Sequence, residues 1–365
     1  MSARVPDRGR ERRVTGAHGL RRHRPGNGRT MRIPRRLIVA SAASLLLLPA
    51  AADARKGSDH GPDRAPHARH GDDRGSHGAD RRGGRLPSTV ALPAGFQPEG
   101  IEARGGVFYA GSQATGQIVV GSVSGGPTRE LVPAQADAPS ALGLRLDGRG
   151  RLFVAGGRTG TVSVYEARTG RLLYRSKPLG EPAFVNDVAL LNDRAVFTDS
   201  AQQRLVVLPL GKGGALGEAR EVPITGSLAY DADPATNEAN GIVRTRDGRG
   251  VIVVNSRTGA LHRADPRTGA STEIPVAGGP LVNGDGLLRS GNALLAVQNR
   301  LNRIAVLKLD RRESRATVKR TITDPQFDVP TTLAVTKGRL FAVNARFTTT
   351  PAADTAYDVV RVDGK

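Results

Sequence analysis

One pattern of hydrophobic and polar positions repeats six times between residue 98 and the end of this sequence. Each copy has a short apolar strand, a turn rich in Gly, and a second apolar strand that ends in polar residues. The clearest copy begins with Glu238-Ala239-Asn240-Gly241-Ile242-Val243, passes through a turn at 246–250, and continues with an apolar run at 251–254. This pattern predicts six units built to one all-β design.

The spacing of the copies indicates the architecture. Positions 100, 143, 187, 241, 286 and 332 are equivalent, so the repeats are 43 to 54 residues long. Units of about 40 to 50 residues with four strands each are typical of β-propeller blades. We therefore predict an all-β, six-bladed β-propeller over residues 86–365, a length that suits a single domain.

The last copy lacks one strand of its blade. It supplies predicted strands at 333–335, 339–343 and 358–362, and the chain then ends. The segment 88–92, just before the first copy, has the residue types of a strand. Pairing it with the last blade would close the ring and remove an exposed sheet edge. We predict that this N-terminal strand completes the sixth blade.

The chain before residue 86 does not contain the repeat. Residues 1–30 are mostly Arg, Gly and polar, which predicts a disordered basic extension. Residues 31–54 have a basic head, a short apolar run and a small-residue cleavage site, which predicts a secretory signal peptide rather than a membrane span. Residues 55–85, rich in Gly, Arg, Asp and His, predict a disordered leader.

These segments lead us to expect a secreted, extracellular protein with no stable membrane insertion. Two interpretations of residues 1–30 stay open: Met31 is the true start, or the signal peptide has a long basic head. An export route through the general or the twin-arginine pathway also stays open, because a bare Arg pair only adds positive charge.

The positive charge of the chain lies mostly outside the predicted propeller. Of the net charge of +20, residues 1–85 account for +12, with 20 Lys and Arg against 8 Asp and Glu. The predicted propeller has no basic stripe interleaved with aromatic residues, so nucleic acid is not an expected partner. We expect a monomer that binds a small molecule. Because the chain has no Cys, disulfides and thiolate metal sites are excluded.

One position of the repeat carries candidate chemistry, and we name it the axial column. Its residue opens the strand nearest the axis in each predicted blade, so the six side chains should face one mouth of the channel. Converging polar groups are costly unless they are hydrated or bound to an ion. The axial column consists of Glu99, Leu142, Asn186, Asn240, Asp285 and Thr331.

The oxygen-bearing members of the column suit a hard cation. Two carboxylates and two amides, without thiol or imidazole, favour Ca²⁺ over Zn²⁺ or copper. We predict a site for Ca²⁺, or another divalent cation, made of Glu99, Asn186, Asn240 and Asp285. A water-filled channel plugged by hydrogen-bonded side chains is the alternative.

The face that holds this site should also hold a substrate. Second strands end on the same face as the axial column. The predicted pocket residues are Phe184, Asp199, Asn255, Gln298, Thr331 and Asn344. Two long loops, 226–238 and 346–357, either form walls or a lid of this pocket or are simple length variations.

The motifs that open four blades resemble those of a known family. Pro98-Glu99-Gly100, Val185-Asn186-Asp187, Glu238-Ala239-Asn240-Gly241 and Asn283-Gly284-Asp285-Gly286 resemble the gluconolactonase and senescence-marker-protein family of six-bladed, calcium-dependent propellers. Their arrangement also resembles the calcium site of the related diisopropyl fluorophosphatase and paraoxonase. The resemblance implies that these residues hold a catalytic ion and that Asp285 acts as nucleophile or as base toward water. An Arg of the family is replaced here by Phe184, which implies a less polar substrate.

Two functions follow from these interpretations. The first is a secreted, calcium-dependent hydrolase of lactones or related esters, with Asp285 as its catalytic residue. The second is a non-catalytic propeller that binds a ligand and uses calcium only for stability. The candidate ligand residues do not separate the two, because a structural ion would use the same side chains, and one scaffold serves many reactions.

Overall fold

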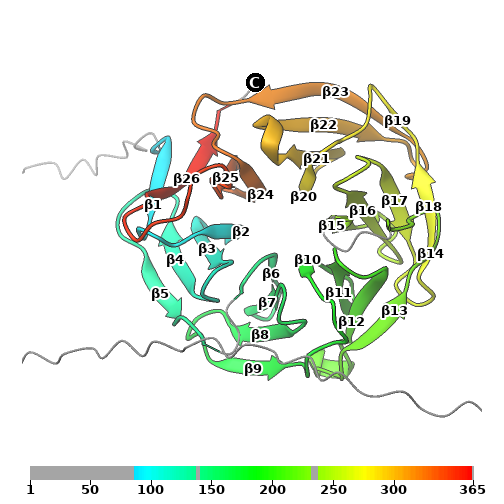
Figure 1. Ribbon diagram of the computed structural model, residues 1–365, viewed down its shortest axis with the longest axis horizontal. Coiled ribbons are helices and arrows are strands. Elements are labelled where there is room, and N and C mark those ends of the chain that lie inside the picture. Colours follow the sequence, from blue (N-terminus) through cyan, green and yellow to red (C-terminus); the bar gives the residue numbers. More distant parts are fainter. Residues whose placement is uncertain (1–85, 137–139, 232–236, 364–365) are drawn as a thin grey trace, which may run out of the picture. The chain divides into compact units, whose positions relative to one another are not determined.

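The computed structural model describes residues 86–136, 140–231 and 237–363. The predicted basic extension, signal peptide and leader, at 1–30, 31–54 and 55–85, lie outside these residues. Within the unit Ala79–Lys365, six sheets are arranged around a central axis, and one edge strand of each sheet lies nearest that axis (Figure 1). The predicted six-bladed β-propeller is confirmed.

The first three blades are four-stranded antiparallel sheets whose strands follow chain order. Blade one contains β2 (Pro98–Arg104), β3 (Val107–Ser112), β4 (Ile118–Ser122) and β5 (Arg129–Val132). Blade two contains β6 (Leu144–Leu146), β7 (Arg151–Ala155), β8 (Val162–Glu166) and β9 (Leu172–Arg175). Blade three contains β10 (Val185–Leu190), β11 (Arg194–Asp199), β12 (Arg204–Pro209) and β13 (Arg220–Pro223).

Blades four and five gain a short fifth strand on their outer edge, contributed by the chain as it enters the blade. Blade four contains β15 (Ala239–Arg244), β16 (Val251–Asn255), β17 (Leu261–Ala264) and β18 (Ala270–Ile274), with β14 (Thr225–Gly226) parallel to β18. Blade five contains β20 (Gly284–Ser290), β21 (Ala293–Gln298), β22 (Arg303–Leu309) and β23 (Ala316–Thr323), with β19 (Val276–Ala277) parallel to β23.

Blade six combines the two ends of the described chain. It contains β24 (Pro330–Thr336), β25 (Arg339–Asn344), β26 (Tyr357–Val362) and, as its outermost strand, β1 (Thr89–Leu92). Strand β1 pairs antiparallel with β26, and Val90 lies opposite Val359. The predicted closure of the ring by an N-terminal strand is therefore confirmed.

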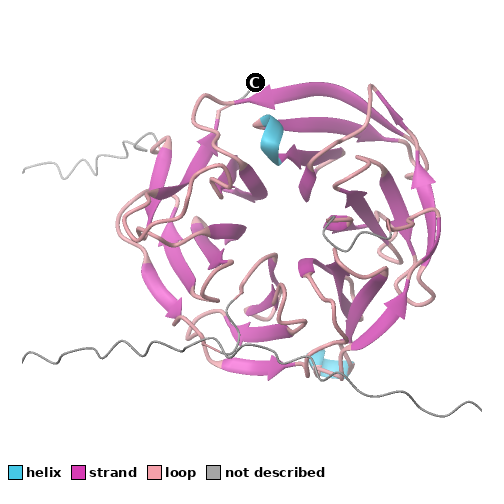
Figure 2. Cartoon of the chain, viewed as in Figure 1, coloured by secondary structure: helices cyan, strands magenta, loops and turns pink. Residues whose placement is uncertain are grey.

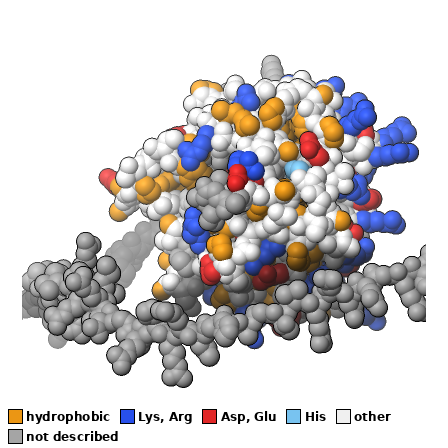
Figure 3. All heavy atoms as spheres, turned by 45° about the vertical axis from the view of Figure 1, so that its right-hand side comes forward, with side chains coloured by type: hydrophobic (Ala, Val, Ile, Leu, Met, Phe, Trp, Pro, Cys, Tyr) orange, Lys and Arg blue, Asp and Glu red, His pale blue; other side chains and the backbone are white. Residues whose placement is uncertain are grey.

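Helix is almost absent from the described residues, as Figure 2 shows. They contain two short 3₁₀ segments, η1 (Lys212–Gly214) and η2 (Asn299–Leu301). Neither has the length or the apolar character that a membrane-crossing helix requires. On the face drawn in Figure 3, Lys and Arg side chains are scattered among the other types and are densest along one edge.

The hydrophobic core lies between neighbouring sheets rather than at the axis. Val, Leu, Ile and Ala side chains fill these interfaces. Four blades also place a Phe on their second strand, where each ring is fully buried: Phe108, Phe153, Phe197 and Phe341. Burial of such a side chain stabilises the fold by about 1.5 to 3 kcal/mol. The repeated Phe thus supplies large apolar surface to a chain without Trp.

The innermost strands are irregular at the axial column. In five blades the register between the first two strands shifts where the column residue lies, after Pro98, Val185, Ala239, Gly284 and Pro330. A β-bulge of this kind turns side chains out of the regular ladder. The bulges therefore turn the column residues out of the ladder, and four of these five residues line a central cavity: Glu99, Asn186, Asn240 and Asp285.

Adjacent inner strands also touch through their backbones. A Cβ added to Gly100 would lie 2.1 Å from the carbonyl oxygen of Leu142, and one added to Gly241 would lie 2.1 Å from that of Asp285. Only Gly permits this approach. The Gly that follows a column residue is therefore what allows neighbouring column residues to converge.

The closing strand gives a test with a built-in control. In β1, Val90 is buried in the core and the adjacent Ala91 is exposed. Val90→Asp buries an unpaired charge and should lower the free energy of unfolding by more than about 3 kcal/mol. Ala91→Asp should lower it by less than about 1 kcal/mol. Urea unfolding measures both, and equal effects would show that β1 does not close the ring.

Candidate functional site

The four predicted ligand residues line one cavity in the centre of the propeller. Glu99, Asn186, Asn240 and Asp285 come from blades one, three, four and five, and each lies on an innermost strand. We name the space the cation cavity; its volume is about 280 Å³. Its other lining residues are Gln113, Leu142, Arg158, Phe184, Asn237, Asn299 and Phe347.

The orientation of the Asn186 amide follows from a hydrogen-bond chain. Asn186 Nδ2 donates to Ser200 Oγ at 2.9 Å, and Ser200 Oγ donates to the carbonyl oxygen of Ala239 at 2.6 Å. Because the single hydroxyl proton is used on that carbonyl, Ser200 can only accept from the amide. The NH₂ group must face Ser200, which leaves the amide oxygen for the channel.

Blade four repeats the arrangement one blade further round the ring. Asn240 Nδ2 donates to Ser256 Oγ at 3.0 Å, and Ser256 Oγ donates to the carbonyl oxygen of Gly284. Asn240 Oδ1 is buried and has no hydrogen-bond partner among the described residues. Each Ser thus orients one amide and ties its blade to the next.

The two carboxyl groups also present unpaired acceptors. Glu99 is 6% exposed and Asp285 is 2% exposed. Asp285 Oδ2 accepts a hydrogen bond from Asn299 Nδ2 at 2.6 Å, whereas Asp285 Oδ1 and Glu99 Oε2 have no partner among the described residues. Buried acceptors without donors are costly. The arrangement can bind a group that offers positive charge or protons.

Burial raises the pKa of both carboxyl groups. It holds the pKa of Glu99 well above its ordinary value, and the nearby Asp285 and Asp187 carboxylates raise it further. Burial also raises the pKa of Asp285 from 3.8 to about 7, although the hydrogen bond from Asn299 acts in the opposite direction. Without a bound cation, the pair therefore retains protons at a pH where exposed carboxyls have lost them.

Arg145 is a cation that lies close to two of the buried carboxyls, Glu99 and Asp187. Its guanidinium donates to the carbonyl oxygen of Leu287 on blade five at 3.3 Å. It lies 3.9 Å from Asp187 and 4.0 Å from Glu102. The Arg145 guanidinium attracts the carboxylates of Glu99, Glu102 and Asp187. A second guanidinium, that of Arg158, belongs to the lining of the cation cavity. A divalent cation would offset much of the remaining negative charge.

No group of three or more His, Cys, Asp or Glu side chains that could hold a metal ion occurs among the described residues. The cation cavity has two such residues, and its other two oxygen donors are amides. Calcium sites commonly use neutral amide and carbonyl oxygens beside carboxylates. The donor set therefore fits calcium even though only two of its four residues are carboxylates.

Of the predicted substrate-pocket residues, Phe184 lines the cavity and the other five do not. Those five are buried and hydrogen-bonded elsewhere. Asp199 accepts from the Phe184 amide and from Arg204 Nε, and Asn255 accepts from two amides of the turn after β16. Gln298 accepts from Arg303, Asn344 donates to Asp358, and Thr331 donates to the Glu99 carbonyl oxygen.

Residues such as Asp199 and Asn255 do not line the cavity because their side chains bind backbone N–H groups of nearby turns. Backbone N–H groups in the turns that leave the second strands need acceptors, and short polar side chains at strand ends supply them. The cavity is also lined by residues that the sequence did not single out: Gln113, Arg158, Asn237 and Phe347. Asn237 and Phe347 belong to the two long loops, so loop length was the signal for them.

Comparisons with known proteins show the fold. No protein-family model and no curated protein sequence matches the chain. The major allergen Mala s 1 of Malassezia sympodialis is 16% identical with a TM-score of 0.59, over 76% of this chain and 97% of the allergen. Virginiamycin B lyase from Staphylococcus aureus is 14% identical with a TM-score of 0.51, over 70% and 80% of the two chains.

A third solved structure leads to the same conclusion. The β-propeller domain of Cps50 (Swd1) from Myceliophteria thermophila is 13% identical with a TM-score of 0.51, over 76% of this chain and 99% of that domain. At such low identity these likenesses establish the β-propeller fold alone. The resemblance to the gluconolactonase and senescence-marker-protein family is not confirmed by them.

The raised pKa values predict how stability depends on pH when a chelator removes divalent cations. The folded state holds the Asp285 proton up to about pH 7, whereas the unfolded state loses it near 3.8. Stability from this group is therefore present below that range and is lost as the pH rises from about 4 to about 7, by up to about 4 kcal/mol.

Asp285→Asn isolates this effect because Asn has nearly the shape of Asp but no group that titrates. In EDTA, the variant should gain stability relative to the wild type as the pH rises from 5 to 8. Urea unfolding at each pH measures the difference. Parallel curves for the two proteins would contradict the proposed burial of the carboxyl pair.

Proposed function

We propose that this protein is a divalent-cation-dependent hydrolase of lactones or related esters. Glu99, Asn186, Asn240 and Asp285 would hold the ion, with Ca²⁺ as the preferred species. One observation carries the proposal: Glu99 Oε2, Asn240 Oδ1 and Asp285 Oδ1 are buried acceptors without a hydrogen-bond partner among the described residues. Each such group costs about 1 to 3 kcal/mol, and one cation would satisfy all three.

The chemistry of the donors supports calcium over softer metals. All four candidate ligands offer oxygen, and Zn²⁺ or copper would favour sulfur or nitrogen. The chain has no Cys. His262 lies on β17 with Nδ1 3.0 Å from Ser227 Oγ, and it does not line the cavity. Ca²⁺ takes six to eight ligands, so four protein ligands would leave positions for water or substrate.

The residues around the site can perform hydrolysis. A bound divalent cation would supply a Lewis acid that polarises an ester carbonyl. Asn299 holds one oxygen of Asp285, which leaves the other oxygen directed at the cavity. Asp285 would attack the carbonyl carbon itself or accept a proton from an attacking water. If Asp285 attacks, the alcohol leaves and one water then hydrolyses the acyl–Asp285 anhydride; if water attacks, the alcohol leaves directly. Either route breaks the ester C–O bond and consumes one water, and gives a carboxylic acid and an alcohol, which stay joined as one hydroxy acid when the substrate is a lactone.

The walls of the cavity suit an ester. Leu142, Phe184 and Phe347 present apolar surface beside the polar centre. Ligand sites typically combine such apolar walls with a few placed polar groups. We also propose that the protein is secreted, because calcium is abundant outside cells and extracellular sites need only modest affinity.

A second candidate function is a non-catalytic binding propeller with a structural ion. The origin of the ligands favours it, because the four side chains come from four blades and an ion would tie those blades together. Ser200 and Ser256 already link three of these blades through hydrogen bonds. The two functions differ in turnover rather than in ion binding.

Calcium should raise the melting temperature of the wild type, and EGTA should reverse the effect, because an ion that binds only the folded state stabilises it. Glu99→Gln and Asp285→Asn should abolish the rise. Asp193→Asn is the matched control, since the Asp193 side chain is 54% exposed and lies outside the cavity. Loss of the rise in Asp193→Asn, or its retention in both cavity variants, would refute the site.

Ser200→Ala tests whether the hydrogen-bond chain orients the Asn186 amide. Without Ser200 Oγ the amide loses its fixed direction, and supporting groups of this kind typically contribute about 10- to 100-fold to metal affinity. Isothermal titration with calcium should show weakening in that range. Unchanged affinity would mean that Asn186 does not bind the ion or is held by other contacts.

Turnover decides between the two functions. A panel of lactones, aryl esters and phosphotriesters, assayed with calcium and with EGTA, should show calcium-dependent hydrolysis of at least one carboxylic ester. Asp285→Asn should lower kcat by at least about 100-fold while the protein stays folded. A wild type that is stabilised by calcium but hydrolyses nothing on the panel would favour the binding propeller.

A further inference from the structure

A second hollow adjoins the cation cavity, and we name it the side pocket. Its volume is about 450 Å³. Gln113, Leu142, Arg158 and Phe184 line both spaces, so the two are neighbours that share a wall. The remaining lining residues of the side pocket are Ala114, Ser140 and Thr159. A molecule bound at the cation cavity could therefore extend into the side pocket.

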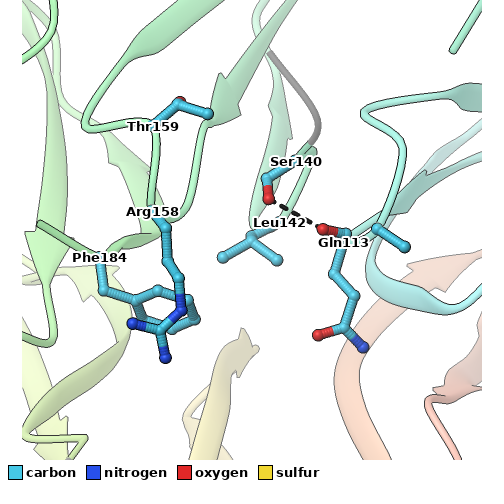
Figure 4. Close-up of a pocket in the computed structure, with 7 residues that line it drawn as sticks. Gln113, Ser140, Leu142, Arg158, Thr159 and Phe184 are labelled. Atoms are coloured by element: carbon cyan, nitrogen blue, oxygen red, sulfur yellow. Dashed lines mark hydrogen bonds between the residues drawn. The ribbon is translucent and has the colours of Figure 1, made fainter. Parts of the chain in front are cut away.

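Arg158 is the charged residue of this shared wall. Its guanidinium carbon lies 5.2 Å from the centroid of the Phe184 ring, and Figure 4 shows the group lying alongside the ring. Because Arg158 is exposed, this cation–π contact favours the observed position by about 0.5 to 1 kcal/mol. No hydrogen bond or ion pair joins Arg158 to another described residue, so its N–H donors are available to a ligand.

Gln113 provides a second donor on the other side of the pocket. Ser140 Oγ donates to the Gln113 carbonyl oxygen at 2.8 Å, which holds the backbone of that loop. In Figure 4 the Gln113 amide and the Arg158 guanidinium extend in the same direction from opposite walls, with Leu142 between them. Two polar donors thus flank an apolar floor.

We propose that the side pocket binds a carboxylate carried by the substrate. This inference rests on the proposed function and specifies its substrate as an ester or lactone with a carboxylate at one end. Arg158 would pair with the carboxylate, Gln113 would donate to it, and Leu142 and Phe184 would contact the apolar part. Planar guanidinium groups match carboxylates with paired hydrogen bonds.

The charge of the pocket favours a carboxylate over a phosphate. Arg158 is the one cationic side chain among its described lining residues. A phosphate monoester carries nearly two negative charges and would need a second cation to balance them. The Phe at position 184 alone suggested a less polar substrate; the structure shows that its ring supports a guanidinium from blade two.

A matched pair of esters tests this assignment by turnover. The probes are 4-acetoxybenzoate, which is anionic, and its neutral methyl ester. We expect a higher kcat/KM for the anionic ester in the wild type. Arg158→Gln should lower the ratio of the two values by about tenfold or more, and Arg158→Lys should lower it less. Arg171→Gln, which removes a charge of the same blade whose side chain is 68% exposed, should keep the wild-type ratio.

A binding measurement separates failure of this inference from failure of the proposed function. Isothermal titration in EGTA would compare 4-hydroxybenzoate with its methyl ester, so that neither turnover nor calcium is involved. The wild type should bind the carboxylate more tightly than the ester, and Arg158→Gln should weaken carboxylate binding at least about tenfold.

Each combination of results has one meaning. Arg158-dependent binding without hydrolysis of either ester would support the carboxylate pocket and refute the hydrolase. Hydrolysis with a ratio and an affinity that Arg158→Gln leaves unchanged would refute the carboxylate pocket and support the hydrolase. A wild type that shows no preference for the anionic probe in either assay would also overturn this inference.

Discussion

The central constraint in this propeller is the contact between neighbouring inner strands. Backbone atoms of one blade press against the next at positions such as Gly100 and Gly241, where even a Cβ would not fit. Hydroxyl groups then join the strands, as Thr331 does by donating to the Glu99 carbonyl oxygen at 2.5 Å. Because the strands are this close, side chains from blades far apart in sequence must share a small volume.

The same contact creates the electrostatic character of the centre. Glu99, Asp187 and Asp285 are buried where the strands converge. Arg145 attracts the carboxylates of Glu99 and Asp187, and Arg158 lies at the wall of the cation cavity. Buried carboxyls of this kind hold protons or bind cations. Burying these carboxyl groups at the axis destabilises the folded protein, and the apolar packing between blades offsets that cost.

The comparisons separate what the scaffold shares from what this chain adds. Proteins with 13% to 16% identity share the β-propeller fold, because that fold needs only strand periodicity and apolar packing. The chemistry depends instead on single side chains near the axis. Arg158 beside Phe184, and the Ser partners of the two Asn amides, are contacts of individual side chains that the β-propeller fold does not by itself require.

The sequence by itself determined the six blades, the closing strand and the residues of the axial column, because strand period, turn chemistry and repeat length are local properties that alignment of the copies makes equivalent. Only the tertiary structure decided how polar side chains divide their hydrogen bonds. Asp199 and Asn255 accept hydrogen bonds from backbone amides. Ser200 accepts from the Asn186 amide, and Arg158 lies over the ring of Phe184. These outcomes depend on which partners lie within about 3 Å in space, and sequence spacing does not contain that information.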